Sequence, residues 1–213
     1  MNYEKKEDYY QNVRLDLLSL LTFDKGYRVL EVGAGHGETL RYLKEKKMAV
    51  EVIGIDITKN KDNSNIDRFI NEDIENVDLS EYKKYFDVII LADVLEHLIE
   101  PQKILNKIKY CLRDDGQILI SIPNIRNIKA IYKVFIKGDF SYEERGIFDY
   151  THLRFFCRRN IKQLVIDSGF RIDTIVSSFT RLDKKPFLKL VNTITFKIFE
   201  EFLTVQYLVK AKQ

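Results

Sequence analysis

Hydrophobic and polar positions follow two alternating periodicities over most of the chain. Four short segments are apolar on both faces and rich in β-branched residues or leucine, at residues 29–32, 50–55, 86–91 and 118–122. Strands that are covered by helices on both sides have this pattern. Between them, residues 38–47 and 101–112 place apolar side chains at helical spacing. This order predicts a parallel sheet in a doubly wound α/β domain.

The two ends of the chain extend this pattern. Tyr10, Val13, Leu17 and Leu20 or Leu21 recur at helical spacing and predict an amphipathic leading helix. Residues 124–157 are rich in lysine, aromatic and turn residues, which indicates an insertion rather than a solvated linker. A helix at 158–167, a strand at 170–176, an amphipathic tail at 186–202 and a final strand at 203–211 should follow. We expect one domain over residues 1–213, made of a leading helix (1–25), a strand-and-helix half (26–123), the insertion (124–157) and closing helices and strands (158–213).

Composition and charge narrow the function only a little. The 213 residues carry 35 Lys and Arg against 32 Asp and Glu, so we expect no nucleic-acid partner. The charged start of the chain does not resemble a signal peptide, and no apolar run reaches the about 20 residues that stable membrane insertion needs. Cys111 and Cys157 lack metal-like or redox-like spacing, which favours reduced thiols and a cytoplasmic location.

The clearest candidate chemistry lies in residues 29–37, VLEVGAGHG. A predicted strand runs into Gly33, Gly35 and Gly37, whose missing Cβ atoms let the backbone turn sharply and present N–H groups to a ligand. The third glycine comes one residue earlier than in the dinucleotide spacing G-x-G-x-x-G, and Glu38 would stand beside a phosphate. This disfavours a nicotinamide oxidoreductase. Glu31 instead suits a ligand with a cationic group.

Four segments in this order resemble class I S-adenosylmethionine-dependent methyltransferases, over about residues 1–180. The Glu-x-Gly-x-Gly-x-Gly run resembles their first motif, and Asp56 resembles the acid that holds the ribose hydroxyls. Asp73 matches the acid that accepts from the adenine amino group, and the segment through Asp93 matches the one facing the methionine end. The resemblance implies S-adenosylmethionine as co-substrate, held by residues 26–123 through Glu31, Gly33, Ala34, Gly35, Gly37, Asp56, Ile57, Asp73, Ile74, Ala92 and Asp93. It also implies a Rossmann-like, seven-stranded, mostly parallel sheet with the last strand antiparallel.

Asp93, Glu96 and His97 stand at i, i+3 and i+4, and share one face if a helix opens directly after the fourth strand. Two carboxylates and an imidazole could ligate a divalent metal. The pattern resembles Glu-x-x-Glu-His of ubiquinone-biosynthesis O-methyltransferases, where it is associated with magnesium. Here Asp shortens the first arm, and Mg²⁺ tolerates imidazole poorly. We therefore expect no metal, and a role for these residues in contacting the acceptor or in starting the helix.

The insertion holds a dense run of aromatic and charged residues at 140–156. Its second half, GIFDYTHLRFF, resembles a segment of class I methyltransferases associated with bacterial surface-glycan biosynthesis. That resemblance implies an acceptor-side insertion and a sugar or glycan acceptor. His152 is our first candidate for the general base because imidazole titrates near neutral pH, and His97 is the second. Asp149 or Arg154 could orient His152. The alternative is that His152 is a hydrogen-bonded core residue and that Asp149 caps a turn.

Basic residues also recur at helical spacing in the insertion, at Arg126, Lys129, Lys133 and Lys137. They form a solvated face, a contact for an acidic acceptor or a membrane-surface contact. The sequence as a whole favours a methyltransferase that acts on a small-molecule or glycan oxygen, with an anionic acceptor and a homodimer left open. A quinone- or polyketide-type O-methyltransferase is the alternative enzyme. A cofactor-binding module without catalysis, which recruits a glycan-synthesis partner, is the alternative from another class.

Overall fold

Seven strands form one sheet in the order β3-β2-β1-β4-β5-β7-β6. The structure, a computed structural model, describes residues 12–22, 26–59, 62, 64–178 and 199–213. Strands β1 to β5 pair in parallel, whereas β7 pairs antiparallel with both β5 and β6. This confirms the predicted fold class. The strands are β1 (Tyr27–Val32), β2 (Ala49–Ile55), β3 (Arg68–Ile70), β4 (Phe86–Ala92), β5 (Leu112–Pro123), β6 (Arg171–Ser177) and β7 (Gln206–Lys212).

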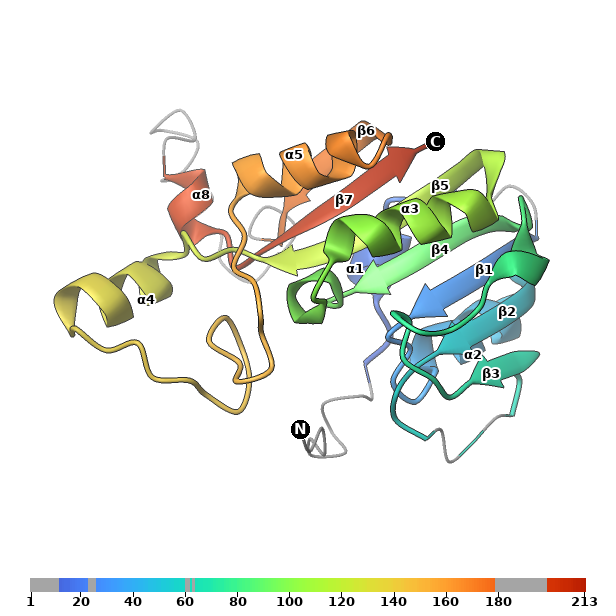
Figure 1. Ribbon diagram of the computed structural model, residues 1–213, viewed down its shortest axis with the longest axis horizontal. Coiled ribbons are helices and arrows are strands. Elements are labelled where there is room, and N and C mark those ends of the chain that lie inside the picture. The colour runs from blue at the N-terminus through green and yellow to red at the C-terminus, as the bar shows by residue number, and fades with distance from the viewer. Residues whose placement is uncertain (1–11, 23–25, 60–61, 63, 179–198) are drawn as a thin grey trace.

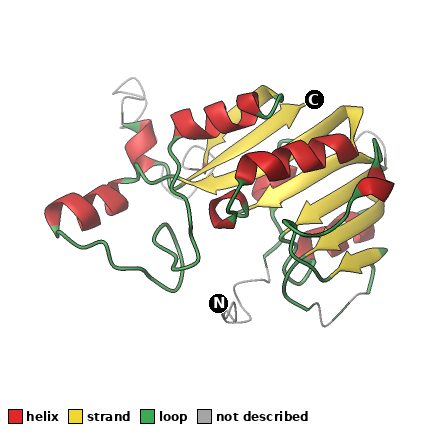
Figure 2. Ribbon diagram, in the orientation of Figure 1, coloured by secondary structure: helices red, strands yellow, loops and turns green. Residues whose placement is uncertain are grey.

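Helices cover both faces of this sheet (Figures 1 and 2). One apolar cluster includes side chains of α3 and α5, and a second one, across the sheet, includes those of α1 and α2. The helices are α1 (Leu15–Leu18), α2 (Glu38–Glu45), α3 (Pro101–Cys111), α4 (Ile128–Ile131), α5 (Arg158–Asp167) and α8 (Glu200–Leu203). Shorter turns are η2 (Ser80–Tyr82) and η3 (Leu95–His97), and η4 (Tyr132–Ile136) is a π-helical continuation of α4.

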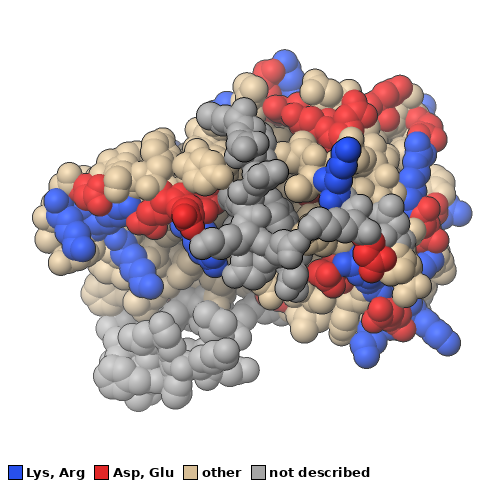
Figure 3. Space-filling view, turned by 90° about the horizontal axis from the view of Figure 1, so that it is seen from below, with Lys and Arg blue, Asp and Glu red and all other residues tan. Residues whose placement is uncertain are grey.

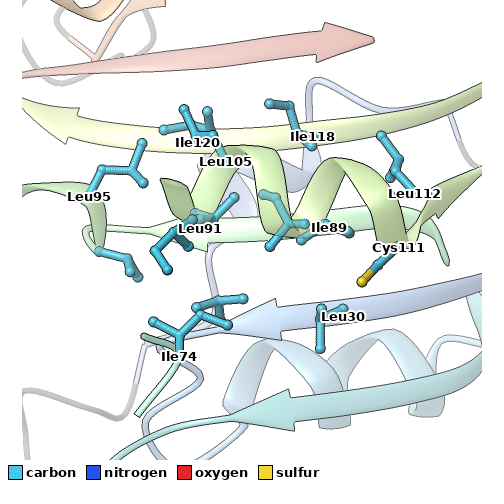
Figure 4. Close-up of a cluster of buried hydrophobic side chains, with 14 of the residues drawn as sticks. Leu30, Ile74, Ile89, Leu91, Leu95, Leu105, Cys111, Leu112, Ile118 and Ile120 are labelled. Atoms are coloured by element: carbon cyan, nitrogen blue, oxygen red, sulfur yellow. The ribbon is translucent and has the colours of Figure 1, made fainter. Parts of the chain in front are cut away.

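The central strands are buried on both faces, which is why their sequences do not alternate. Ile89 and Leu91 of β4 point into the cluster beneath α3, where they meet Leu105 and Cys111 (Figure 4). Val88 and Ile90, one position away in each case, belong to the cluster on the opposite face. Side chains of successive strand residues point to opposite faces, so both sets must be apolar when both faces are covered.

Some predicted boundaries were wrong. Among the described residues of this segment, only Leu15–Leu18 form the leading helix, and Tyr10 lies outside the described residues. Leu20 and Leu21 follow α1 in a turn but still pack against the cluster that includes α2, so their helical spacing reflects burial rather than helix. Strand β5 begins at Leu112, well before residue 118, and the final strand begins at Gln206 rather than at residue 203. Most of the predicted tail at 186–202 lies outside the described residues.

The insertion leaves the sheet where β5 ends and returns at an isolated bridge between Asn124 and Phe156. Its helix α4 extends away from the sheet, beyond the edge toward which the arrowheads of β1, β4 and β5 point (Figure 1). The loop that follows α4 folds back toward that edge. Both signs of charge are interspersed on the face drawn in Figure 3. Within the described part of the chain, helices are too short or too polar to cross a bilayer.

Candidate active site

A cavity of about 1110 Å³ opens where the carboxyl ends of β1, β2 and β4 meet. In open α/β sheets, ligands bind at such an edge, where the strand order reverses. The order β2-β1-β4 places this reversal between β1 and β4. Ten of the eleven candidate cofactor residues line the cavity, namely Glu31, Gly33, Ala34, Gly35, Asp56, Ile57, Asp73, Ile74, Ala92 and Asp93. Gly37 does not line it, and instead precedes α2 with a left-handed φ of 77°.

The glycine loop is tied to the end of β2 through Asp56. Oδ2 of Asp56 accepts a hydrogen bond of 2.7 Å from the N–H of Gly35. Oδ1 accepts from the backbone N–H of Thr58 at 2.7 Å and also from its hydroxyl. A carboxylate oxygen can accept two hydrogen bonds, so Oδ2 retains the capacity to accept one from a ligand hydroxyl. The side chain is therefore placed both to shape the loop and to meet a ligand in the cavity.

Glu31 is a buried acid at the wall of the cavity, with 3% of its surface exposed. Its Oε2 has no hydrogen-bond partner among the described residues. Burial raises the pKa of Glu31 to about 8, although the nearby Arg14 and a hydrogen bond with Thr39 oppose the rise. A carboxyl group held in this way would be relieved by a ligand that brings a positive charge or a hydrogen-bond donor.

Arg14 organises the same side of the cavity, and no sequence motif pointed to it. Its guanidinium donates to Oδ2 of Asp93 at 2.8 Å and to both carboxylate oxygens of Asp16 at 2.9 and 3.0 Å. Asp93 also accepts from the hydroxyl of Ser121 at 2.9 Å and from the side-chain amide of Gln206. Asp93 has a left-handed φ of 57°, so this network fixes a strained backbone position at the end of β4.

The predicted common face of Asp93, Glu96 and His97 does not form. Residues 95–97 make only a short 3-10 turn, and α3 begins at Pro101. A proline disfavours helical backbone geometry at the residue that precedes it, and Glu100 accordingly has φ −131° and ψ 73°. The Asp93 side chain therefore pairs with Arg14, whereas Glu96 faces His152 from the insertion. The prediction that a helix opens directly after β4 was wrong.

His97 lines the cavity, and its imidazole is hydrogen-bonded to Thr151 of the insertion. Nδ1 of His97 lies 3.1 Å from the carbonyl oxygen of Thr151 and 3.0 Å from its hydroxyl. A carbonyl oxygen only accepts, so Nδ1 carries the proton and Nε2 of the neutral ring does not. The Thr151 hydroxyl in turn donates to Asp149 at 2.7 Å. The chain Asp149–Thr151–His97 thus sets the tautomer of a ring at the cavity wall.

His152 and Asp149 lie behind this ring and do not line the cavity. Asp149 is fully buried, and its Oδ1 also accepts the backbone N–H of Thr151. His152 is 6% exposed, with Nδ1 3.0 Å from the carbonyl oxygen of Ile147. Arg154 does not orient it, because its guanidinium donates to the carbonyl oxygens of Leu98 and Ile99. The structure therefore gives His97, not His152, direct access to a ligand.

Comparison with known proteins agrees with this architecture. A family model described as a methyltransferase domain matches residues 4–175. The chain belongs to the methyltransferase domain family. This methyltransferase has the fold of two solved S-adenosylmethionine-dependent methyltransferases. One is from Archaeoglobus fulgidus and superposes with a TM-score of 0.65 at 20% sequence identity. The match covers 98% of this chain and 95% of the Archaeoglobus chain. The other is from Mesorhizobium loti and superposes with a TM-score of 0.64 at 15% sequence identity. The match covers 93% of this chain and 96% of the Mesorhizobium chain.

Curated relatives of the methyltransferase have different activities. It is 25% identical over 169 residues to a ubiquinone biosynthesis O-methyltransferase of Coxiella burnetii, which covers 75% of this chain and 70% of the relative. It is 28% identical over 146 residues to a carboxy-S-adenosyl-L-methionine synthase of Nautilia profundicola, with 63% and 60% covered. The family match identifies the chain as a methyltransferase. Because the activities of these relatives differ, they do not identify the methyl acceptor.

Proposed function

We propose that this methyltransferase transfers the methyl group of S-adenosylmethionine to a hydroxyl oxygen of a sugar-derived or other small acceptor. One observation carries the proposal: a single cavity is lined both by the glycine loop and by His97, Thr151 and Arg145. Its volume of about 1110 Å³ exceeds the roughly 300–1,000 Å³ typical of a site for one small ligand. The cavity thus has room for a donor and an acceptor together.

The residues at the two ends of the cavity suit these two ligands. Asp56 and Asp73, each at or just beyond the end of a strand, offer carboxylates to the ribose and adenine of the donor. The cationic methionine end would lie toward Glu31, whose buried carboxyl favours a positive neighbour. The sulfonium methyl would then face His97 and Asp93. Most of the rate would come from holding the acceptor oxygen in line with that methyl group.

We assign the proton acceptor to His97. The ring faces the cavity, and the hydrogen bond from Nδ1 to Thr151 leaves Nε2 as the basic nitrogen. His152, the first candidate from the sequence, lies behind it and has no direct route to the acceptor. Asp149 acts through Thr151 by holding the tautomer, which makes it a positioning residue.

Arg145 and the insertion motif support a sugar-derived acceptor. Arg145, in the loop that returns from α4, lines the cavity and would favour an acceptor with a phosphate or carboxylate group. The surrounding segment resembles that of glycan-associated methyltransferases. A phenolic acceptor is the second candidate, and the similarity to a ubiquinone biosynthesis O-methyltransferase over 169 residues favours it.

The test is incubation of the purified chain with methyl-labelled S-adenosylmethionine and separate acceptor sets. These are nucleotide sugars, sugar phosphates, neutral sugars and dihydroxyphenols. We expect S-adenosylhomocysteine release and label in a sugar-containing product, strongest with the anionic sugars. Label in the phenols alone would replace the proposal by the second candidate. Tight binding of S-adenosylhomocysteine with no transfer to any set, in parallel with an active control enzyme, would favour a cofactor-binding module without catalysis.

A further inference from the structure

Three side chains with metal-ligating atoms converge behind the cavity wall. Glu96 and His97 come from the turn after β4, and His152 comes from the insertion. One ligand atom from each lies within 4.8 Å of the other two. We propose that Glu96, His97 and His152 form a binding site for a divalent transition-metal ion such as Zn²⁺.

The Glu96 carboxylate is buried without hydrogen-bond donors from the described residues. The side chain is 1% exposed, and neither of its oxygens has a hydrogen-bond partner among the described residues. Nε2 of His152, a group that can carry positive charge, lies 4.0 Å from Oε1 of Glu96, which is longer than a hydrogen bond. Buried polar groups in native proteins are normally satisfied, and a buried carboxylate without donors is costly. A cation among the three side chains would satisfy both oxygens.

Backbone carbonyl oxygens orient the imidazoles of both histidines. Nδ1 of His97 donates to the carbonyl oxygen of Thr151, and Nδ1 of His152 lies 3.0 Å from that of Ile147. Each ring is thus fixed in the tautomer whose Nε2 carries a lone pair. Metal-binding histidines are usually anchored in this way, through the second ring nitrogen, by a carbonyl or carboxylate. Here Nε2 of His152 is the nitrogen that faces Glu96.

The donor set selects the class of metal. Two imidazoles and one carboxylate suit Zn²⁺ and neighbouring first-row ions, with the fourth position open to water or substrate. Mg²⁺ prefers oxygen ligands in octahedral geometry and does not fit this set. Atoms bound to one zinc ion lie about 3–3.5 Å apart, given bonds of about 2.0–2.2 Å, so the cluster needs side-chain shifts on the order of 1 Å. Asp93 is not part of the site, because Arg14, Ser121 and Gln206 engage its carboxylate.

The site has a route to solvent and a consequence for catalysis. His97 also lines the cavity, so an ion can reach the cluster from there and present its open position to the acceptor. A metal bound to Nε2 of His97 occupies the nitrogen that we assign to proton transfer. Metal binding and proton transfer at His97 therefore exclude each other, and Zn²⁺ inhibits the enzyme. This inhibition rests on the proposed function; the metal site itself does not.

Titration of tag-free protein with Co²⁺ tests the site without any need for an acceptor. We expect one Co²⁺ per chain, with the visible absorption of a four-coordinate N/O site, and displacement by Zn²⁺. Glu96→Gln keeps the shape of the side chain and should weaken Co²⁺ binding at least ~10-fold, since even outer-shell changes often cost that much. The matched controls are Glu100→Gln, at an exposed acid four residues later, and His36→Asn, at the remaining histidine. Both should bind Co²⁺ as the wild type does.

Several outcomes would overturn the metal site. These are the absence of a Co²⁺ spectrum in folded wild-type protein, unchanged affinity in Glu96→Gln, and loss of binding in either control. His152→Asn provides a second variant, with its fold checked by circular dichroism and by S-adenosylhomocysteine binding. Inhibition of methyl transfer by Zn²⁺ is measured in a separate activity assay. If no acceptor is found, the Co²⁺ titration still decides the site; if transfer proceeds and no Co²⁺ binds, only the metal site falls.

Discussion

The rings of His97 and His152 meet edge to face, with centroids 4.7 Å apart and planes at 67°. Only His97 lines the cavity, whereas 4% of the His152 side chain is exposed. Both rings donate from Nδ1 to a backbone carbonyl, so their tautomers match while their access to ligands differs. The contributions of the two histidines to turnover and to stability should therefore be separable.

Substitution of His97 should affect catalysis far more than binding. His97→Asn, assayed in EDTA to remove any bound metal, should lower turnover ~10²–10⁴-fold, the usual range for a positioned acid–base group. Its affinity for S-adenosylhomocysteine, measured by calorimetry, should stay close to that of the wild type. His152→Asn should instead lower the melting temperature, because it changes a buried hydrogen-bonded ring, and should affect turnover less. The reverse pattern would return the catalytic role to His152.

Asp56 should contribute directly to cofactor affinity. S-Adenosylmethionine and S-adenosylhomocysteine should raise the melting temperature, as ligands of the native state do, and NAD should not. Asp56→Ala should weaken S-adenosylhomocysteine binding by ~1–3 kcal/mol, the scale for losing hydrogen bonds to a charged group. Asp114→Ala, at an exposed acid on β5, is the control and should bind normally. Equal stabilisation by NAD, or unchanged affinity in Asp56→Ala, would contradict the cofactor assignment.

Substitution of Gly33 should destabilise the fold more than substitution of Gly138, because only at Gly33 would an added Cβ clash with a neighbouring side chain. Gly33 and Gly138 have similar φ angles, +69° and +66°, so alanine at either position costs about 1–2 kcal/mol of backbone strain. A Cβ on Gly33 would also lie 2.5 Å from Cγ2 of Val94, whereas one on Gly138 would meet no atom within 4 Å. Urea unfolding should show a clearly larger loss for Gly33→Ala, together with weakened S-adenosylhomocysteine binding. Equal losses in the two variants would refute the steric argument.

Sequence patterns predicted the parts of this molecule that depend on local order. The two-faced apolar runs located the central strands, because their side chains alternate between two buried surfaces. The glycine loop and Asp56 were found because a sharp turn after a strand requires particular residues at particular places. Their role in binding the cofactor stays a prediction that the substitutions above can test.

Contacts between distant parts of the chain could not be predicted in this way. Arg14 reaches Asp93 across 79 positions, and Gln206 reaches it across 113. Nothing local to either residue signals that contact. The choice between His97 and His152 likewise depends on which ring the packed insertion buries. The prediction that Asp93, Glu96 and His97 share a helical face was wrong because these residues have helical spacing but do not lie in an α-helix. The α-helix begins only at Pro101.

Glu31 should make the stability of the fold depend on pH. Burial raises its pKa from 4.5 to about 8, against the effects of Arg14 and Thr39 and with a further rise from Asp56. Below the lower value both the folded and the unfolded chain hold the proton, so the residue contributes no pH dependence. Between the two values the unfolded chain ionises while the folded chain stays protonated, so the free energy of unfolding falls as pH rises. Above about 8 the loss is complete and constant.

Glu31→Gln removes this titration and keeps the size of the side chain. Its free energy of unfolding, measured with urea, should gain on that of the wild type as pH rises from 4.5 to about 8, by an amount on the order of a few kcal/mol. Glu81→Gln, at an exposed acid, should show no such gain. A stability difference between Glu31→Gln and wild type that stays constant over this range would show that Glu31 titrates normally in the folded chain. In that case a ligand cation would not be needed to relieve its burial.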